Sequence, residues 1–323
     1  MDPTPASTQA STAATDTSVL RRRARARALP AVLRGATWLF GSVPWPVAQR
    51  LGSLLGRLAW RVNGRDRKRT LDHLAIAFPD MDPRQRRALG HASLRHLGTS
   101  VGELLHLLRR PPGEAQKHVR VEGFEEIERL RTEGRPIVVL MAHCGNWELT
   151  SVANLSHGLG LAASARELDE EVLHDLAVRL RARLGSETIP RGSRGAGRQL
   201  LRVLRSGGAL AMLIDQDLKA PGIWVPFFGR MAHTPPGAAE IALRFGAAVV
   251  PTFCERLGDG SHTLRFHPTL DLPDDVTEAT AVMTAAIEKQ VRRRPEQWVW
   301  LHRRWRRPPP DPQPRTEGDR RRR

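Results

Sequence analysis

Short apolar runs alternate with helix-like stretches along most of the chain after residue 118. The runs are four to seven residues long, and most are rich in alanine, leucine or β-branched residues, which is typical of buried strands. Strands are expected at 119–123, 137–142, 161–165, 187–190, 209–214 and 247–253, and helices at 124–133, 147–157, 169–184, 195–206 and 276–293. Strands that alternate with helices form mostly parallel sheets. The alternation therefore predicts an α/β fold, with a mostly parallel central sheet flanked by helices.

The expected strand 137–142 ends in a polar group, His143-Cys-Gly-Asn146, and a helical pattern follows. Open α/β sheets bind ligands at the carboxyl ends of their strands, so His143 is a candidate site residue. His143 and Glu148 are five positions apart, and on one helix they would point about 140° away from each other. They can meet only if His143 precedes the helix and Glu148 points back from its first turn. Gly145 permits the sharp turn and Asn146 is a favoured cap.

A carboxylate beside an imidazole fixes its tautomer and stabilises its charged form, as a general base requires. The spacing of His143 and Glu148 allows this arrangement. It equally allows a histidine that caps the sheet, with Glu148 favoured by the helix dipole. Cys144 suggests a thiol nucleophile, but adjacent residues point in different directions, which disfavours a Cys144–His143 pair.

A second polar group, Asp215-Gln-Asp217, follows the expected strand 209–214. Asp215 is a candidate site residue or an acid that caps the next turn. The segment 221–229 is expected to be an apolar loop, and a helix is expected to start at 234 with Thr234 as its cap. A hairpin is expected over 253–267, turning near Gly258-Asp-Gly.

The amino-terminal part reads as helical. We expect a disordered basic tail at 1–30, a helical, membrane-associated segment at 31–120, an α/β core at 121–305 and a disordered Arg/Pro-rich tail at 306–323. Within the helical segment, one helix is expected to end at Pro79, a second to run from Asp82 through Leu89, and a third to carry Val101 to Leu108.

Residues 36–61 combine an apolar helical face with arginines and three tryptophans, Trp38, Trp45 and Trp60. Leu51, Leu54, Leu55 and Leu58 share that face, whereas Pro44 and Pro46 interrupt the segment. The uninterrupted apolar length is short for a spanning helix, and tryptophans with basic neighbours suit the headgroup region of a membrane. An ordinary helix packed on the core is the alternative.

The net charge of +17 calls for an anionic partner. Phospholipid headgroups, an acidic carrier protein and nucleic acid all qualify. Nucleic acid is disfavoured, because the chain has no tyrosine, no zinc-finger spacing and no aromatic RNA-binding motif. Two cysteines provide no disulfide framework and no CxxC metal pair, and no metal site is expected.

Four stretches together resemble the bacterial lipid A biosynthesis acyltransferase family, the enzymes that add late acyl chains of the lauroyl and myristoyl type. They are His143-Cys-Gly-Asn-Trp-Glu148, Asp215-Gln-Asp217, Val225-Pro-Phe-Phe-Gly229 with Thr234-Pro, and Pro295-Glu-Gln-Trp-Val-Trp-Leu-His-Arg-Arg-Trp305. The upstream Leu74-Ala-Ile-Ala-Phe-Pro79 is also similar, and the resemblance covers about residues 35–306. Phosphatidylinositol mannoside acyltransferases are similar in the same segments, so the acceptor stays open.

The resemblance implies transfer of an acyl chain from an acyl carrier protein or CoA thioester to a hydroxyl of a lipid A precursor, without a cofactor. His143 would be the base and Glu148 would orient it. The oxyanion would be bound by the backbone N–H groups at Gly145 and Asn146 or by an arginine. The family arginine corresponds best to Arg166, although Ser164-Ala-Arg-Glu departs from the usual aromatic–Arg–Pro. Further implied site residues are Asp215, which would hold Arg166 or the imidazole, Asp217, and Phe227 and Phe228, which would line an acyl groove or pack the core.

The implied partners are the donor thioester, an anionic lipid acceptor and a membrane surface. The implied location is the cytoplasmic face of the inner membrane, with peripheral attachment or one amino-terminal anchor. Three alternatives stay open: the same chemistry on another glycolipid, phospholipid or aminolipid, a thioesterase in which the dyad activates water, and a non-catalytic membrane-binding protein.

Overall fold

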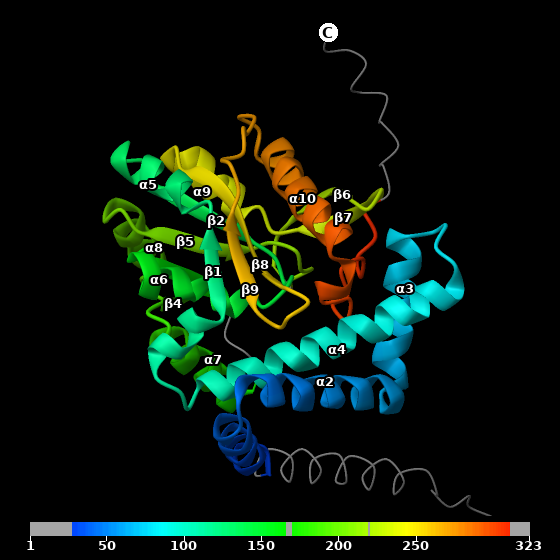
Figure 1. Ribbon diagram of the computed structural model, residues 1–323. Helices are drawn as coiled ribbons and strands as arrows, with labels where there is room; N and C mark the ends of the chain where they lie inside the picture. Colours follow the sequence, from blue (N-terminus) through cyan, green and yellow to red (C-terminus); the bar gives the residue numbers. More distant parts are fainter. Residues whose placement is uncertain (1–27, 166–169, 219, 311–323) are drawn as a thin grey trace, which may run out of the picture.

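A seven-stranded sheet forms the centre of the computed structural model, which describes residues 28–165, 170–218 and 220–310. The strand order is β1-β9-β8-β2-β5-β3-β4 (Figure 1). The strands are β1 (Val119–Glu122), β2 (Ile137–Met141), β3 (Leu161–Ala165), β4 (Glu187–Pro190), β5 (Ala209–Leu213), β8 (Ala248–Arg256) and β9 (His262–Phe266). All neighbours pair in parallel except β8 and β9, which form the predicted antiparallel hairpin. The predicted α/β architecture with a mostly parallel sheet is confirmed.

Both faces of the sheet are covered by helices. In β2, Val138 and Leu140 pack in one hydrophobic core, whereas Ile137, Val139 and Met141 pack in the other. The first core includes side chains of α8 (Ala196–Arg205), α9 (Gly237–Phe245) and α10 (Val276–Arg293), and the second includes side chains of α5 (Phe124–Thr132), α6 (Val152–His157) and α7 (Glu171–Arg183). This burial on both sides explains why the strand is a continuous apolar run.

Helices also form the amino-terminal part, beginning with residues 28–42. They continue as α2 (Trp45–Val62), α3 (Gly64–Ala77) and α4 (Pro83–Leu107), and short 3-10 helices occupy Pro112–Lys117, Trp147–Ser151 and Pro295–Gln297. The second and third predicted helices are therefore one, α4. The interval between them, residues 90–100, was misread as a break, because its glycines, Gly90 and Gly98, pack against Trp60 and Gly52 of α2 rather than ending the helix.

Helices α2 and α4 lie side by side (Figure 1) and touch at glycines. A Cβ on Gly56 would lie 2.2 Å from the Leu94 carbonyl oxygen, and one on Gly52 would lie 2.4 Å from the Gly98 oxygen. The buried face of α2 also carries Trp45 and Trp60. The prediction that these two tryptophans contact a membrane is therefore wrong, while Trp38 is exposed.

The predicted loop 221–229 is a hairpin of β6 (Ile223–Phe227) and β7 (Arg230–Thr234). Phe228 and Gly229 both have positive φ, which suits a two-residue hairpin turn. Thr234 ends β7 and does not cap a helix, because α9 starts at Gly237 after Pro236.

No helix within the described ranges is long and apolar enough to cross a membrane. Residues 1–27 and 311–323, most of the two predicted tails, lie outside the described residues, and residues 28–30 are already helical.

Candidate active site

The parallel register of β2 and β5 brings His143 to Asp215. Met141 is paired with Leu213 at the ends of these strands, and each site residue lies two positions further along its chain. The Asp215 Oδ1 is 2.8 Å from the His143 Nδ1, and Oδ2 accepts the His143 backbone N–H at 2.8 Å. Neighbouring strand ends thus hold both partners at the edge where open α/β sheets bind ligands.

Asp215 is buried and fully engaged. Its Oδ2 also accepts the indole N–H of Trp298 at 2.8 Å. Burial alone would raise the pKa of Asp215, but the charge of His143 and the hydrogen bonds from His143 and Trp298 lower the pKa below its usual value. The carboxylate therefore stays charged and can stabilise a proton on the imidazole.

Asp215 occupies the position beside the imidazole that was predicted for Glu148. Glu148 instead forms a two-point ion pair with Arg181 of α7, at 2.7 Å to Nε and 2.5 Å to Nη2. The residues after Asn146 form a 3-10 helix, Trp147–Ser151, rather than an α-helical first turn. The two halves of the predicted dyad are therefore each paired with a different partner.

The predicted oxyanion donors at Gly145 and Asn146 are also engaged elsewhere. The Gly145 N–H donates to the Gln297 carbonyl oxygen at 2.9 Å, and the Asn146 N–H donates to the Cys254 carbonyl oxygen at 3.0 Å. These bonds attach the turn after β2 to the carboxyl-terminal segment through Gln297 and to β8 through Cys254. Because both amides already donate to backbone carbonyls, the turn disfavours the first predicted source of oxyanion donors and leaves the second, an arginine.

Gly145 is required by its surroundings. Its φ is +66°, and a Cβ would lie 1.8 Å from the Cys254 oxygen, which belongs to backbone and cannot rotate away. We expect Gly145→Ala to destabilise the fold by at least about 3 kcal/mol or to displace the turn and abolish activity. Urea unfolding and turnover measure the two effects, with Gly134→Ala as a control of similar φ and open space. Two variants of equal stability and activity would contradict this expectation.

A cavity of about 190 Å³ opens beside the imidazole. It is lined by His143, Trp147, Ser164, Ala165, Arg181, Arg191, Leu213, Gln216 and Leu218. No side-chain hydrogen bond or ion pair within the described ranges engages the guanidinium of Arg191. Arg166, the predicted family arginine, lies outside the described residues. Arg181 and Arg191 were not predicted, because the chain carries many arginines and helical spacing alone marks none of them.

His302 lies 5.1 Å from His143, measured between ring centroids, and its Nε2 contacts the side-chain amide of Gln216. Burial and the charge of His143 lower the pKa of His302 to about 4. His302 is therefore neutral near pH 7 and does not repel a proton on His143. The family resemblance identified the segment from Pro295 to Trp305 as a matching motif, but it assigned no role to His302 or Trp298 within it.

Other predicted residues lie away from the cavity. The Asp217 side chain is buried beside His233, Arg306 and Arg307, with nitrogen–oxygen distances of 3.1 to 3.4 Å. Its place among these groups makes it an anchor for the carboxyl-terminal segment, in place of the predicted contact with substrate or oxyanion.

Phe227 and Phe228 belong to the hydrophobic core, where they contact each other and Phe227 contacts Trp298. Core packing, one of the two predicted roles, is therefore the one observed. Cys144 is buried, and burial raises the pKa of its thiol, which disfavours a thiolate nucleophile. No group of three metal-binding side chains occurs within the described part of the chain.

Comparison with known proteins gives one family, described as bacterial lipid A biosynthesis acyltransferase, which matches residues 21–307. The chain is 28% identical over 276 residues to the lipid A biosynthesis palmitoleoyltransferase of Escherichia coli K12, covering 84% of this chain and 89% of the relative. It is 28% identical over 278 residues to the lauroyltransferase of the same organism. The phosphatidylinositol mannoside acyltransferase of Mycolicibacterium smegmatis is 27% identical over 274 residues, with the same coverage of 84% and 89%.

Proposed function

The chain belongs to the bacterial lipid A biosynthesis acyltransferase family, and we propose that it transfers a fatty acyl chain from an acyl carrier protein or CoA thioester to a hydroxyl of a lipid A precursor. Membership makes it an acyltransferase that acts on lipid A or a related glycolipid. The proposed reaction uses no cofactor beyond the donor thioester.

One observation carries the mechanism: the hydrogen bond from His143 Nδ1 to the buried carboxylate of Asp215. With Nδ1 occupied, Nε2 is the nitrogen available to a substrate, and the His143 side chain is 20% exposed and lines the cavity. An imidazole held in one tautomer by a buried acid, with its second nitrogen accessible, is the arrangement of a general base.

In the proposed reaction, Nε2 takes the proton of the acceptor hydroxyl as its oxygen attacks the thioester carbonyl carbon. The carbon–oxygen bond forms and the carbonyl oxygen becomes an oxyanion. When the tetrahedral intermediate collapses, the carbon–sulfur bond breaks, and the thiolate takes the proton back from His143. Asp215 stabilises the charged imidazole between the two proton transfers.

The oxyanion needs donors other than the Gly145 and Asn146 amides. We assign this role to Arg191, which lines the cavity and has a guanidinium without a partner among the described side chains. Arg181 lines the same cavity but is held by Glu148. The Glu148–Arg181 pair then forms part of the wall of the site, and the guanidinium of Arg191 stabilises the negative charge that develops on the carbonyl oxygen.

The similar proteins are named for two classes of acceptor, lipid A and phosphatidylinositol mannoside. Identity to the lipid A enzymes is 28% and identity to the phosphatidylinositol mannoside enzyme is 27%, over nearly equal lengths. A phosphatidylinositol mannoside or another glycolipid is therefore the second candidate acceptor.

Purified enzyme given acyl carrier protein thioester, with and without a late lipid A precursor, tests the proposal by mass spectrometry. We expect a lipid product heavier by one acyl chain, formed only when the acceptor is present. Acylation of a mannosylated phosphatidylinositol instead would replace the acceptor and keep the chemistry. Release of free fatty acid at the same rate without any acceptor would replace the proposal with a thioesterase.

We further propose attachment to the cytoplasmic face of the inner membrane through the amino-terminal helices. Seven large apolar side chains between residues 28 and 62 are exposed: Val32, Trp38, Leu39, Leu54, Leu55, Leu58 and Val62. Four of them lie on α2, where they are 51 to 72% exposed. Exposed arginines, Arg50, Arg57 and Arg61, lie on the same helix. An apolar stripe with basic neighbours supports binding to anionic lipid.

Replacing Leu54, Leu55 and Leu58 together by serine is expected to weaken binding to phosphatidylglycerol-containing vesicles by at least about tenfold, because each leucine loses apolar area that lipid would cover. Vesicle sedimentation measures the binding, and circular dichroism checks the fold. Leu173, Leu257 and Met231, which are exposed elsewhere, form the matched triple serine control. Equal binding of both triple variants would place the attachment outside α2.

A further inference from the structure

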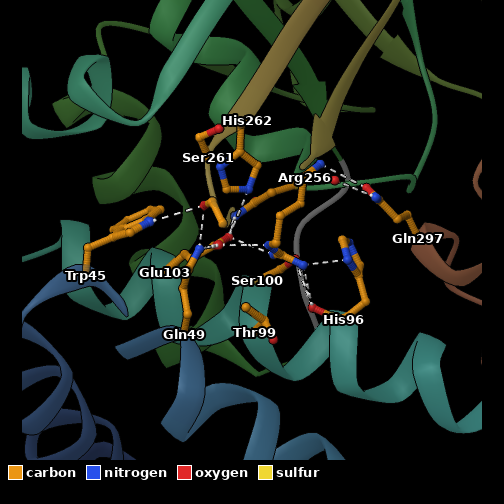
Figure 2. Close-up of polar contacts among 12 residues, drawn as sticks. Trp45, Gln49, His96, Thr99, Ser100, Glu103, Arg256, Ser261, His262 and Gln297 are labelled. Atoms are coloured by element: carbon orange, nitrogen blue, oxygen red, sulfur yellow. Dashed lines mark hydrogen bonds and ion pairs between the residues drawn. The ribbon is translucent and has the colours of Figure 1, made fainter. Parts of the chain in front are cut away.

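A buried carboxylate lies behind the turn that follows His143. Glu103 of α4 is fully buried, and its carboxylate is contacted by side chains from several elements (Figure 2). Gln49 of α2 donates to Oε1 at 2.7 Å, and Arg256 at the end of β8 donates through Nε to Oε1 at 2.9 Å and through Nη2 to Oε2 at 2.8 Å. His262 at the start of β9 lies 3.3 Å from Oε2.

A buried charge with this many partners has a specific structural effect. Burial would raise the pKa of Glu103, but the charges of His262 and Arg256 and their hydrogen bonds lower the pKa below its usual value. The carboxylate is therefore ionised, and each of its hydrogen bonds is charge-assisted and directional. Such a group fixes the positions of its partners more closely than apolar packing does.

One partner belongs to the turn itself. The Asn146 side-chain Nδ2 donates to Glu103 Oε2 at 2.8 Å. Asn146 is almost completely buried, so its side chain is committed to Glu103 and not to the cavity. Asn146 lies three positions after His143, and the backbone between them is already held at Gly145 by Gln297.

Arg256 connects the same carboxylate to the opposite side of the turn. Gln297 accepts the Arg256 backbone N–H at 3.0 Å and donates to the Arg256 carbonyl oxygen at 2.8 Å. Gln297 is also the residue whose carbonyl accepts the Gly145 N–H. Glu103 therefore reaches the turn twice, directly through Asn146 and indirectly through Arg256 and Gln297.

We propose that Glu103 is a positioning residue for acyl transfer: through Asn146 and Arg256 it fixes the turn 144–146 and thereby the orientation of His143 toward Asp215 and the substrate. This inference rests on the proposed function for its kinetic readout. Glu103 is buried and does not line the cavity beside His143, so it acts through the turn.

Asn146→Ala tests the inference with Gln49→Ala as its matched control. Both variants remove one amide donor to Glu103, at 2.8 and 2.7 Å, and only Asn146 belongs to the turn. We expect Asn146→Ala to lower kcat about 10- to 100-fold with KM changed less than about twofold, since a displacement near 1 Å costs about this much. Gln49→Ala is expected to keep kcat within about threefold, and both variants to unfold at similar urea concentrations. Equal kcat values for the two variants would overturn the proposal.

A double-variant cycle separates a role through Glu103 from an independent contact of Asn146 with substrate. If Asn146 acts through Glu103, Glu103→Gln combined with Asn146→Ala lowers kcat no further than about twofold below the lower single variant. Multiplying effects would overturn the proposal. Should Glu103→Gln fail to fold, the comparison of Asn146→Ala with Gln49→Ala still decides.

The ¹⁵N resonances of the His143 ring provide a readout that needs no turnover. We expect Asn146→Ala, and not Gln49→Ala, to shift the Nδ1 resonance, because the hydrogen bond to Asp215 changes length. If the wild-type chain shows no acyl transfer while the two variants differ in the Nδ1 shift, the proposed function is refuted and the positioning role is kept. Normal transfer with identical shifts in both variants would refute the positioning role alone.

Discussion

His143→Ala is expected to lower kcat for acyl transfer by about 10²- to 10⁴-fold, because the variant loses the only group proposed to take the proton of the acceptor hydroxyl. KM for the donor thioester should change little, since the imidazole is proposed to act on the acceptor hydroxyl and not on the acyl chain. Quantifying acylated product from purified enzyme at saturating donor measures the effect.

Urea unfolding and vesicle binding serve as controls that His143→Ala keeps its fold. Removal of the imidazole also takes a hydrogen-bond partner from the buried Asp215 carboxylate, so the urea midpoint should fall somewhat while the chain stays folded, and vesicle binding should be unchanged. Addition of imidazole to His143→Ala offers a second check, because a small base that enters the emptied space should restore part of the rate. Turnover above about a tenth of the wild-type value would remove His143 from the mechanism.

Asp215→Asn is expected to lower kcat by about 10²- to 10⁴-fold through the tautomer of His143. An asparagine amide at this position can donate a hydrogen bond to Nδ1, which moves the imidazole proton to Nε2, and a protonated Nε2 cannot act as a base. The buried carboxylate also accepts hydrogen bonds from the His143 backbone and Trp298, so some loss of stability accompanies the loss of activity.

Glu148→Gln provides the comparison that decides which acid orients the histidine. It removes the charge partner of Arg181 and leaves the His143–Asp215 hydrogen bond in place. Two-dimensional ¹H–¹⁵N spectra of the ring should show the Nε2 tautomer in Asp215→Asn and the wild-type tautomer in Glu148→Gln. The reverse assignment would return the orienting role to Glu148.

The positions of His143 and Asp215 at the ends of strands could be predicted from the hydrophobic pattern of the sequence. The apolar run before His143 and the one before Asp215 each predict a buried strand that delivers a polar residue. Their pairing requires that β2 and β5 be neighbours in register, and the sequence order does not reveal this, since two strands, β3 and β4, lie between them in the chain.

The partner of Glu148 was not predictable, because the direction of a side chain depends on the type of turn that carries it. A 3-10 helix after Asn146 directs Glu148 to Arg181, while the sequence spacing allowed it to face His143. The use of the Gly145 amide was hidden for a related reason. Its acceptor, Gln297, is more than 150 residues away, and no local pattern marks such a contact. Helix α4 was predicted as two helices for another reason. Its glycines suggested an interruption, whereas in the structure they allow close contact with α2.

The close contact of α2 with α4 has a consequence for the geometry of the proposed membrane complex. Because carbonyl oxygens and glycines meet directly along this contact, the two helices cannot tilt against each other without steric overlap. A chain bound through the exposed leucines of α2 would therefore settle at one angle to the bilayer. Helix α4, which carries Glu103, would then hold a fixed position relative to the lipid surface through the same contact.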